Sequence, residues 1–262
     1  MRAVGLLLAL ILGLRAPVAL AQNVDLELIL AVDVSMSMDA EEQRIQRQGY
    51  AEAFLSPAVL DAIRSGPNGR IAVSYVEWAG VADQQIVIPW TLVDGEAAAA
   101  AVAETLLNAP RTRIRRTSIS GALVFSQTHF EQNPYRGLRR VIDISGDGPN
   151  NQGPIVTDAR DAVVAKGITI NGLPLMFRAG GMMDIAQLDE YYRDCVIGGA
   201  AAFVLPVTST ENFARAIREK LILEISGLTP KGASVLTAAS PTTAPTVSCT
   251  IGEFLWRQRM EN

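Results

Sequence analysis

Apolar stretches alternate with amphipathic stretches along most of the chain. Residues 26–34 form a nearly continuous apolar run, which is typical of a strand buried on both faces of a parallel sheet. Asp39 and Glu42 then form a capping-box signature, and a helical pattern continues to Leu55. Pro57 restarts a second, short helix. This part of the chain is therefore predicted to be one strand followed by two helices.

Two further apolar runs, at residues 70–78 and 85–92, are joined by a connection that is short enough for a hairpin. The second of them is therefore expected to be an antiparallel edge strand. Beyond them, strand and helix patterns alternate, as they do in doubly wound sheets. We expect strands at residues 140–145, 168–175 and 201–207, and helices at 95–108, 118–131, 155–166, 184–192 and 211–225. The predicted fold class is α/β: a doubly wound, mostly parallel six-stranded sheet with one antiparallel edge strand and helices on both faces.

The two ends of the chain depart from this pattern. Residues 1–21 combine a basic start, an apolar run and a small-residue ending, which is the shape of a secretory signal peptide. The apolar run is shorter than the roughly 20 residues that cross a bilayer, so we expect a periplasmic or secreted protein with no membrane span after signal removal. Residues 22–227 are predicted to be the domain. Residues 228–262 are predicted to be a Pro-, Thr- and Ala-rich tail whose apolar end could dock back on it.

Charge and cysteine content limit which classes of partner and which cellular compartments are expected. The formal net charge is −4, and residues 1–21 contribute two arginines and no acidic residue, so the exported chain is more acidic still. We therefore expect no nucleic-acid partner. Cys195 and Cys249 are the only cysteines. In an exported chain they could form a disulfide worth about 4 kcal/mol by chain entropy, or remain separate thiols.

The sharpest chemical signal lies where the first strand ends. Asp33, Ser35 and Ser37 carry oxygen atoms at alternate positions, and alternate residues of an extended chain share a side. The carboxyl end of a central strand is also where ligands generally bind in open α/β sheets. Oxygen donors without His or Cys favour Mg²⁺ over zinc, with Mn²⁺ and Ca²⁺ as other candidates.

Two other segments offer further ligands. Thr117 stands at the start of a predicted helix, and Asp147 follows the strand at residues 140–145 within a Gly-Asp-Gly sequence. Each feature has another explanation by itself: the Asp-x-Ser-x-Ser run could be turn and capping residues, Thr117 a helix cap and Asp147 a turn residue. Their order along the chain, beside predicted central strands, favours one joint metal site.

Taken together, these residues resemble the metal-ion-dependent adhesion site (MIDAS) of von Willebrand factor type A and integrin inserted domains. The resemblance covers about residues 24–226, and the chain is most similar to bacterial exported members of that superfamily. It implies that the hydroxyls of Ser35 and Ser37 bind the ion directly, in one loop with Asp33. It also implies that Thr117 and Asp147 bind the ion directly or through water. Mg²⁺ takes six oxygens, so five protein groups would leave a position for an Asp or Glu of a partner protein.

The predicted function is an exported, metal-dependent protein-binding module and not an enzyme. The alternative is a Mg²⁺-dependent hydrolase of a phosphate-type substrate, because an open metal site beside arginines could polarise such a group. Against it, Ser35 stands where an aspartyl-nucleophile phosphatase usually has a second Asp, and no candidate general base has a clear placement. A third hypothesis is a structural domain with a vestigial site.

Three other features carry weaker signals. Glu77 lies in an apolar strand and is either a hydrogen-bond partner of a metal ligand or an edge-facing carboxylate. The arginine-rich loop at residues 111–116 precedes Thr117 and could steer an acidic partner or be a plain solvated loop. His129 is the only histidine and is predicted to be a solvated residue near a helix end.

Overall fold

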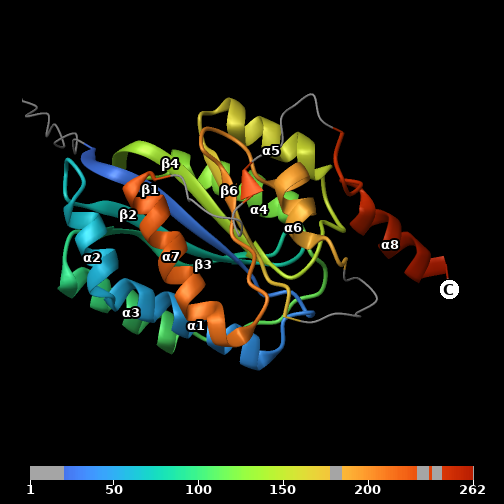
Figure 1. The fold of residues 1–262 in the computed structure, drawn as a ribbon, viewed down its shortest axis with the longest axis horizontal. Helices are drawn as coiled ribbons and strands as arrows, with labels where there is room; N and C mark the ends of the chain where they lie inside the picture. Colours follow the sequence, from blue (N-terminus) through green and yellow to red (C-terminus); the bar gives the residue numbers. More distant parts are fainter. Residues whose placement is uncertain (1–20, 178–184, 229–235, 238–243, 262) are drawn as a thin grey trace, which may run out of the picture.

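A twisted sheet crosses the middle of the molecule in the computed structural model, which describes residues 21–177, 185–228, 236–237 and 244–261 (Figure 1). The sheet has seven strands in the order β3-β2-β1-β4-β5-β6-β7. The strands are β1 (Gln22–Asp33), β2 (Ile71–Trp78), β3 (Gln84–Val93), β4 (Tyr135–Gly146), β5 (Thr169–Pro174), β6 (Phe203–Val204) and β7 (Leu236–Thr237).

Helices cover both faces of this sheet (Figure 1). One face carries α1 (Ala40–Leu55), α2 (Pro57–Arg64), α3 (Glu96–Asn108) and α7 (Phe213–Ser226). The other face carries α4 (Ile119–Glu131), α5 (Val156–Ala165), α6 (Leu188–Tyr191) and the π-helix η1 (Tyr192–Val196). The described part of the chain also contains η2 (Thr210–Asn212) and α8 (Ile251–Glu261).

Strand pairing confirms the predicted fold class. β1 pairs in parallel with β2 and β4, β4 with β5, and β5 with β6, while β3 is antiparallel to β2. The tail adds a strand that the sequence pattern does not indicate, because β7 contains two residues and lies in a Thr-, Ala- and Ser-rich stretch. It pairs antiparallel with β6, so both outer strands of the sheet are antiparallel to their neighbours.

The central strand β1 is buried on both sides, which is why its sequence is almost continuously apolar. Leu28 and Leu30 belong to the core cluster under α1 and α7, while Ile29 and Ala31 belong to the cluster under α4 and α5. Successive side chains of a strand point to opposite faces, so one strand contributes to two cores. Burying a side chain such as Leu stabilises the fold by about 1.5–3 kcal/mol.

The predicted capping box fixes where α1 begins. The Glu42 N–H donates to Asp39 Oδ1 and the Asp39 N–H donates to Glu42 Oε2, each at 2.8 Å. Asp39 therefore ends the loop that follows β1 within six residues of Asp33. Among the residues that the structure describes, no helix has the length and apolar character needed to cross a bilayer.

The prediction for His129 is wrong. Its side chain is buried, with Nε2 3.0 Å from the Ser74 hydroxyl and the ring stacked on Trp90 at 5.3 Å between centroids. The last turn of α4 packs against the β2–β3 hairpin, so this position faces the sheet and not the solvent. Burial lowers the pKa of His129 below its ordinary value.

Candidate metal centre

The loop between β1 and α1 brings the first three predicted ligands together. The Ser35 N–H donates to Asp33 Oδ1 at 2.6 Å, and the Met38 N–H donates to the Ser35 carbonyl at 3.0 Å. These bonds turn the chain directly after the strand. The Oγ atoms of Ser35 and Ser37 consequently lie 2.8 Å apart.

Asp147 reaches the same place from the neighbouring strand. β1 and β4 are parallel neighbours, so their carboxyl ends lie at one edge of the sheet. The Ser37 hydroxyl donates to Asp147 Oδ1 at 2.7 Å, across 110 positions of sequence. The structure therefore gathers Asp33, Ser35, Ser37 and Asp147 at one point.

Asp33 has the electrostatic character of a cation ligand. Its side chain is fully buried, and its Oδ2 atom has no hydrogen-bond partner among the described residues. Burial and, after it, the negative charge of Asp147 raise the pKa of Asp33 well above the ordinary value, although hydrogen bonding by Ser35 and by the Asp147 backbone opposes the shift. A buried carboxylate oxygen without a partner is costly in a folded protein. A divalent cation bound to this oxygen and the adjacent hydroxyls would remove that cost, so the donor set fits Mg²⁺ or Mn²⁺.

Thr117 is held at the same edge of the sheet through its backbone. Its N–H donates to Asn151 Oδ1 at 3.0 Å, and the Asn151 N–H donates to the Thr117 carbonyl at 2.8 Å. An isolated parallel bridge pairs Ile114 with Ser35, so the segment before Thr117 runs along the metal loop. The structure thus places Thr117 at the same edge of the sheet as the metal loop, through contacts that use its backbone and not its hydroxyl.

Glu77 fixes the start of the arginine-rich loop and is not an edge-facing carboxylate. It is 2 % exposed and forms an ion pair with Arg47 of α1, with Arg47 Nη2 2.6 Å from Glu77 Oε1. The same guanidinium donates to the carbonyls of Ala109 and Pro110, the latter at 2.8 Å. Burial raises the pKa of Glu77, with Arg47 opposing that shift. Glu77 therefore holds the Arg47 guanidinium against the start of this loop.

The arginine-rich loop lies directly over the metal loop. Arg113 donates from Nη2 to the Met36 carbonyl at 2.7 Å, and Met36 stands between the two serines. Arg111 and Arg115 are exposed. The loop thus forms a basic rim beside two carboxylates.

Comparison with known proteins places the chain in a family. The family model described as "Protein of unknown function (DUF1194)" matches residues 23–229. The chain belongs to this family. No curated protein sequence matches this DUF1194 member.

Solved structures show which fold this DUF1194 member has. Proximal thread matrix protein 1 from the mussel byssus, solved with a zinc-occupied MIDAS motif, aligns with a TM-score of 0.55 at 13 % identity, over 79 % of this chain and 49 % of that chain. The pilus adhesin SpaC of Lactobacillus rhamnosus GG gives 0.60 at 9 % identity, over 78 % and 31 %. A von Willebrand factor type A protein of Catenulispora acidiphila gives 0.51 at 13 %, over 78 % and 43 %. The chain spans about half or less of the length of these proteins. The von Willebrand factor type A-like fold is thereby confirmed.

Two asparagines that sequence reasoning missed support the ligand loops. Asn150 accepts the Ser120 N–H at Oδ1 at 3.0 Å, and its own N–H donates to the Tyr191 hydroxyl at 3.2 Å. Asn151 holds Thr117, as described above. Nothing in the local sequence distinguishes these side chains from ordinary turn residues, because their partners are distant in sequence: Thr117, Ser120 of α4 and Tyr191 of α6.

Tyr192 is a further residue that the sequence did not indicate. A methyl group at Gly146 would lie 2.9 Å from Asp33 Oδ2 and 3.0 Å from the Tyr192 hydroxyl, so these groups meet where β4 ends. The hydroxyl is buried and has no hydrogen-bond partner among the described residues. Tyr192 begins the π-helix η1, a type of local irregularity that is frequent at functional sites.

Of the two alternatives that the sequence left open for the cysteines, the structure has the disulfide. Cys195 of η1 is bonded to Cys249, which precedes α8, with an S–S distance of 2.02 Å and the Cα atoms 5.4 Å apart. The bond joins the tail to the helical face that contains Tyr192. The end of the tail is therefore docked on the domain, as its apolar residues suggested.

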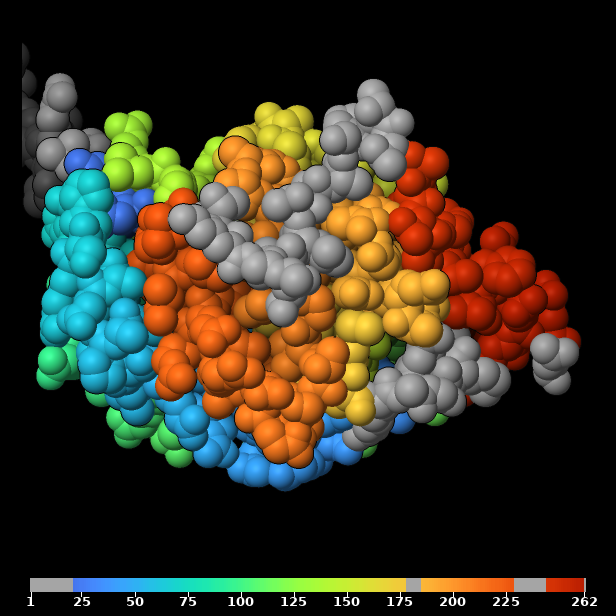
Figure 2. All heavy atoms as spheres, in the orientation of Figure 1, coloured from blue at the N-terminus to red at the C-terminus, as the bar shows by residue number. Residues whose placement is uncertain are grey.

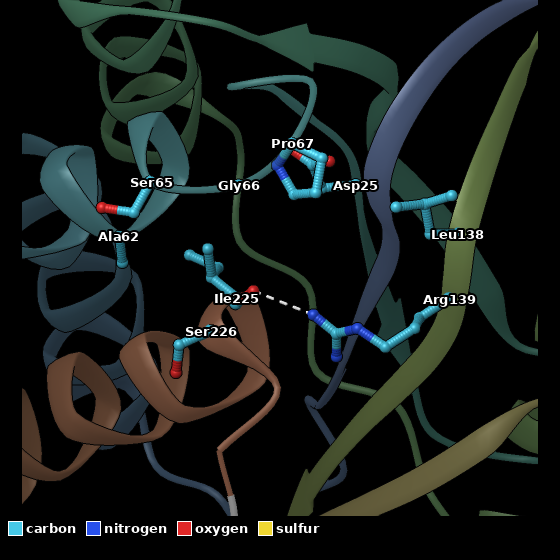
Figure 3. A pocket seen from close by; sticks show the side chains of 9 residues that line it. All are labelled: Asp25, Ala62, Ser65, Gly66, Pro67, Leu138, Arg139, Ile225 and Ser226. Carbon is cyan, nitrogen blue, oxygen red and sulfur yellow. Dashed lines mark hydrogen bonds between the residues drawn. The ribbon is translucent and has the colours of Figure 1, made fainter.

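A cavity of about 420 Å³ lies at the opposite edge of the sheet (Figure 3). Asp25, near the start of β1, is on its wall and accepts hydrogen bonds from the Asn68 N–H at 2.8 Å and the Arg70 N–H at 3.3 Å. Arg139, near the start of β4, donates to the Ile225 carbonyl at 2.8 Å. Asp25 and Arg139 thus each have hydrogen-bond partners elsewhere in the chain, and the length of β1 separates them from the metal loop.

Proposed function

We propose that this protein is an exported, metal-dependent protein-binding module. Asp33, Ser35, Ser37, Thr117 and Asp147 would hold Mg²⁺ or Mn²⁺, and the ion would bind an Asp or Glu of a partner protein. The observation that carries the proposal is the buried Asp33 Oδ2, which has no hydrogen-bond partner within the described part of the chain, beside the linked hydroxyls of Ser35 and Ser37. The zinc-occupied MIDAS motif of the mussel byssus protein and the adhesin role of SpaC support it.

When bound, the ion supplies an electrophilic centre for an incoming carboxylate. The chain's own residues prepare the place for it. The Ser35 N–H fixes one Asp33 oxygen, and Ser37 links this loop to Asp147. Because the ligands belong to loops that the sheet and α1 already hold, little ordering is left for the moment of binding.

The basic rim is an argument for a partner that carries negative charge. Arg111, Arg113 and Arg115 are exposed, whereas the whole chain carries a net charge of −4. A local positive field at a binding face raises the association rate of a negatively charged partner and weakens as salt is added. Partner association is therefore expected to slow with rising ionic strength.

A hydrolase is the weaker alternative. Its general base would have to come from some residue other than His129, because that residue is buried beneath Trp90 and bonded to Ser74. Export to the periplasm or beyond is also part of the proposal. It rests on the sequence of residues 1–21, most of which lie outside the described residues, and on the disulfide, which suits an oxidising compartment.

Calorimetry of the purified chain with MgCl₂ and MnCl₂ tests the metal site. We expect uptake of one ion, lost in Asp33→Ala and retained in the control Asp161→Ala, whose carboxylate is exposed. Absence of uptake by the wild type would overturn the proposal. Capture of proteins from an extract in Mg²⁺, followed by elution with EDTA, then identifies the partner. Turnover of phosphoesters that disappears in Asp33→Ala would favour the hydrolase instead.

A further inference from the structure

The C-terminal helix α8 lies at the end of the molecule where the metal loops are. Figure 2 shows α8 in red, projecting from the body beside the segment that contains η1. Its first turn is partly buried and its last residues are exposed. Ile251 packs against the core cluster under α4 and α5. The hydrogen bond of Glu253 and the ring contact of Trp256 fall on the two loops that present Asp147 and Thr117.

The first contact is with the loop that follows Asp147. Gly252 packs so closely on this loop that a Cβ atom at position 252 would lie 2.0 Å from the Asn150 carbonyl oxygen. The Asn150 side chain donates from Nδ2 to Glu253 Oε1 at 2.7 Å. Only glycine permits this approach, so the helix and the loop are fitted to one another.

The second contact is with the residue before Thr117. The guanidinium carbon of Arg116 lies 3.5 Å from the ring centre of Trp256, which is the geometry of a cation–π contact. Arg116 has a φ of 80°, a left-handed conformation that non-glycine residues rarely adopt. Such a conformation persists only where surrounding contacts hold it, and the Trp256 ring is one of them.

A covalent tether holds α8 in this place. The Cys195–Cys249 bond precedes the helix by two residues, and the Thr246 N–H donates to Asp194 Oδ2 at 2.6 Å. Both anchors on the domain belong to η1, which also contains Tyr192 beside Asp33. The tail is thus joined to the metal edge at three places: η1, the Asn150 loop and Arg116.

We infer that α8 is a positioning element of the metal centre. By clamping Asn150 and Arg116, it sets the loops that hold Asp147 and Thr117, and the disulfide keeps it docked. Thr117 is bound to Asn151 through two hydrogen bonds, so a shift of either clamped residue is passed to both loops. The inference rests on the proposed metal site for its effect on affinity, but the positioning itself is measurable without metal.

The test uses variants that displace α8 and touch none of the proposed ligands. Gly252→Ala places a methyl group against the Asn150 carbonyl, and since alanine is the better helix former, the helix itself is retained. Trp256→Ala removes the ring over Arg116, and Trp256→Phe restores an aromatic face there. Phe254→Ala is the matched control, because Phe254 belongs to the same helix and is 47 % exposed.

Two measurements decide the inference. Hydrogen exchange of the metal-free chain should show lost protection at the Thr117 and Asn151 amides in Gly252→Ala and Trp256→Ala, and wild-type protection in Trp256→Phe and Phe254→Ala. Calorimetry with MnCl₂ should show affinity lowered about 10-fold in the first two variants, as is typical when the support of a ligand is removed. Unchanged exchange in both displacing variants would overturn the positioning role. If the wild type takes up no Mn²⁺ while the exchange pattern holds, the proposed function fails and the positioning of the loops stands.

Discussion

Two pairs of carboxylates lie on neighbouring parts of this fold and differ in their surroundings: Asp33, Asp143 and Glu224 are buried, and Asp147 is half-buried. In the core, Asp143 of β4 and Glu224 of α7 share Lys220, whose Nζ is 2.5 Å from Glu224 Oε1 and also contacts Asp143. At the edge of the sheet, Asp33 and Asp147 meet beside serine hydroxyls. Among the described residues, no lysine or arginine forms an ion pair with Asp33. The core pair therefore has a lysine between its two carboxylates, whereas no such cation contacts Asp33 among the described residues.

The largest effect is expected from removing the internal cation. Lys220→Met would leave Asp143 and Glu224 buried with no positive charge between them, so the free energy of unfolding should fall by about 3–5 kcal/mol. Urea denaturation of the metal-free chain measures this loss. Lys166→Met, at an exposed position, is the control and should change stability by less than about 0.5 kcal/mol. A loss no larger than the control would show that Lys220 is not the cation of this network.

The core network should also make stability depend on pH. Burial and, after it, the charge of Asp143 raise the pKa of Glu224 to about 7 from 4.5, although Lys220 opposes the shift. The folded state therefore holds this proton more tightly than the unfolded state, and stability should fall as pH rises from about 4.5 to 7. The fall should be about 3 kcal/mol.

Glu224→Gln isolates that dependence. The variant lacks the titrating group, so its stability should exceed that of the wild type increasingly as pH rises from 5 to 8. The comparison of the two proteins is needed because the pKa of His129 is lowered by burial, and its titration makes stability rise with pH below about 6.5. Parallel curves for wild type and variant would contradict the assignment to Glu224.

Some residues of the two carboxylate pairs could be placed from the sequence, and others could not. The strands and most helices follow from the apolar pattern, and Asp33, Ser35, Ser37 and Asp147 could be placed together because parallel strands bring their carboxyl ends to one edge. Lys220 could not be placed, since a lysine four residues before a glutamate on an amphipathic helix is typical of a solvated pair. Its burial is decided by the packing of α7 on β4 and β5.

Other features depend on contacts that no local pattern contains. His129 was predicted to be solvated, but the β2–β3 hairpin covers it. The helix predicted at residues 184–192 is α6, which begins at Leu188 and continues as the π-helix η1. The sequence allowed a disulfide and a docked tail, yet the position of α8 is set by Gly252 and Trp256 meeting distant loops.

Metal should stabilise the edge of the sheet and leave the core network unaffected. At a concentration of 100 times Kd, a bound ion raises the free energy of unfolding by about 2.7 kcal/mol. We expect this increment with MgCl₂ or MnCl₂ in the wild type and in Glu224→Gln, and its loss in Asp33→Asn. Thermal unfolding with and without EDTA measures it. Equal stabilisation of Asp33→Asn and wild type would place the ion elsewhere.

The smallest effect is opposite in sign to that of Lys220→Met. In the metal-free protein, Asp33→Asn removes a buried charge whose Oδ2 has no hydrogen-bond partner among the residues that the structure describes, and its Oδ1 can still accept from the Ser35 N–H. Stability should therefore rise by about 1 kcal/mol, whereas Lys220→Met lowers it.

Asp25→Asn is the matched control for the expected rise in stability of Asp33→Asn. Asp25 belongs to the same strand and is also buried, but both of its oxygens accept backbone N–H groups, from Asn68 and Arg70. In Asp25→Asn, an NH₂ group replaces one of the two carboxylate oxygens. This group is a donor and would face a backbone N–H that is also a donor, so the free energy of unfolding should fall by about 1–2 kcal/mol. If Asp33→Asn destabilises the metal-free chain as Asp25→Asn does, then Asp33 is satisfied within the protein. The contrast between the two carboxylate pairs would then no longer point to an external cation.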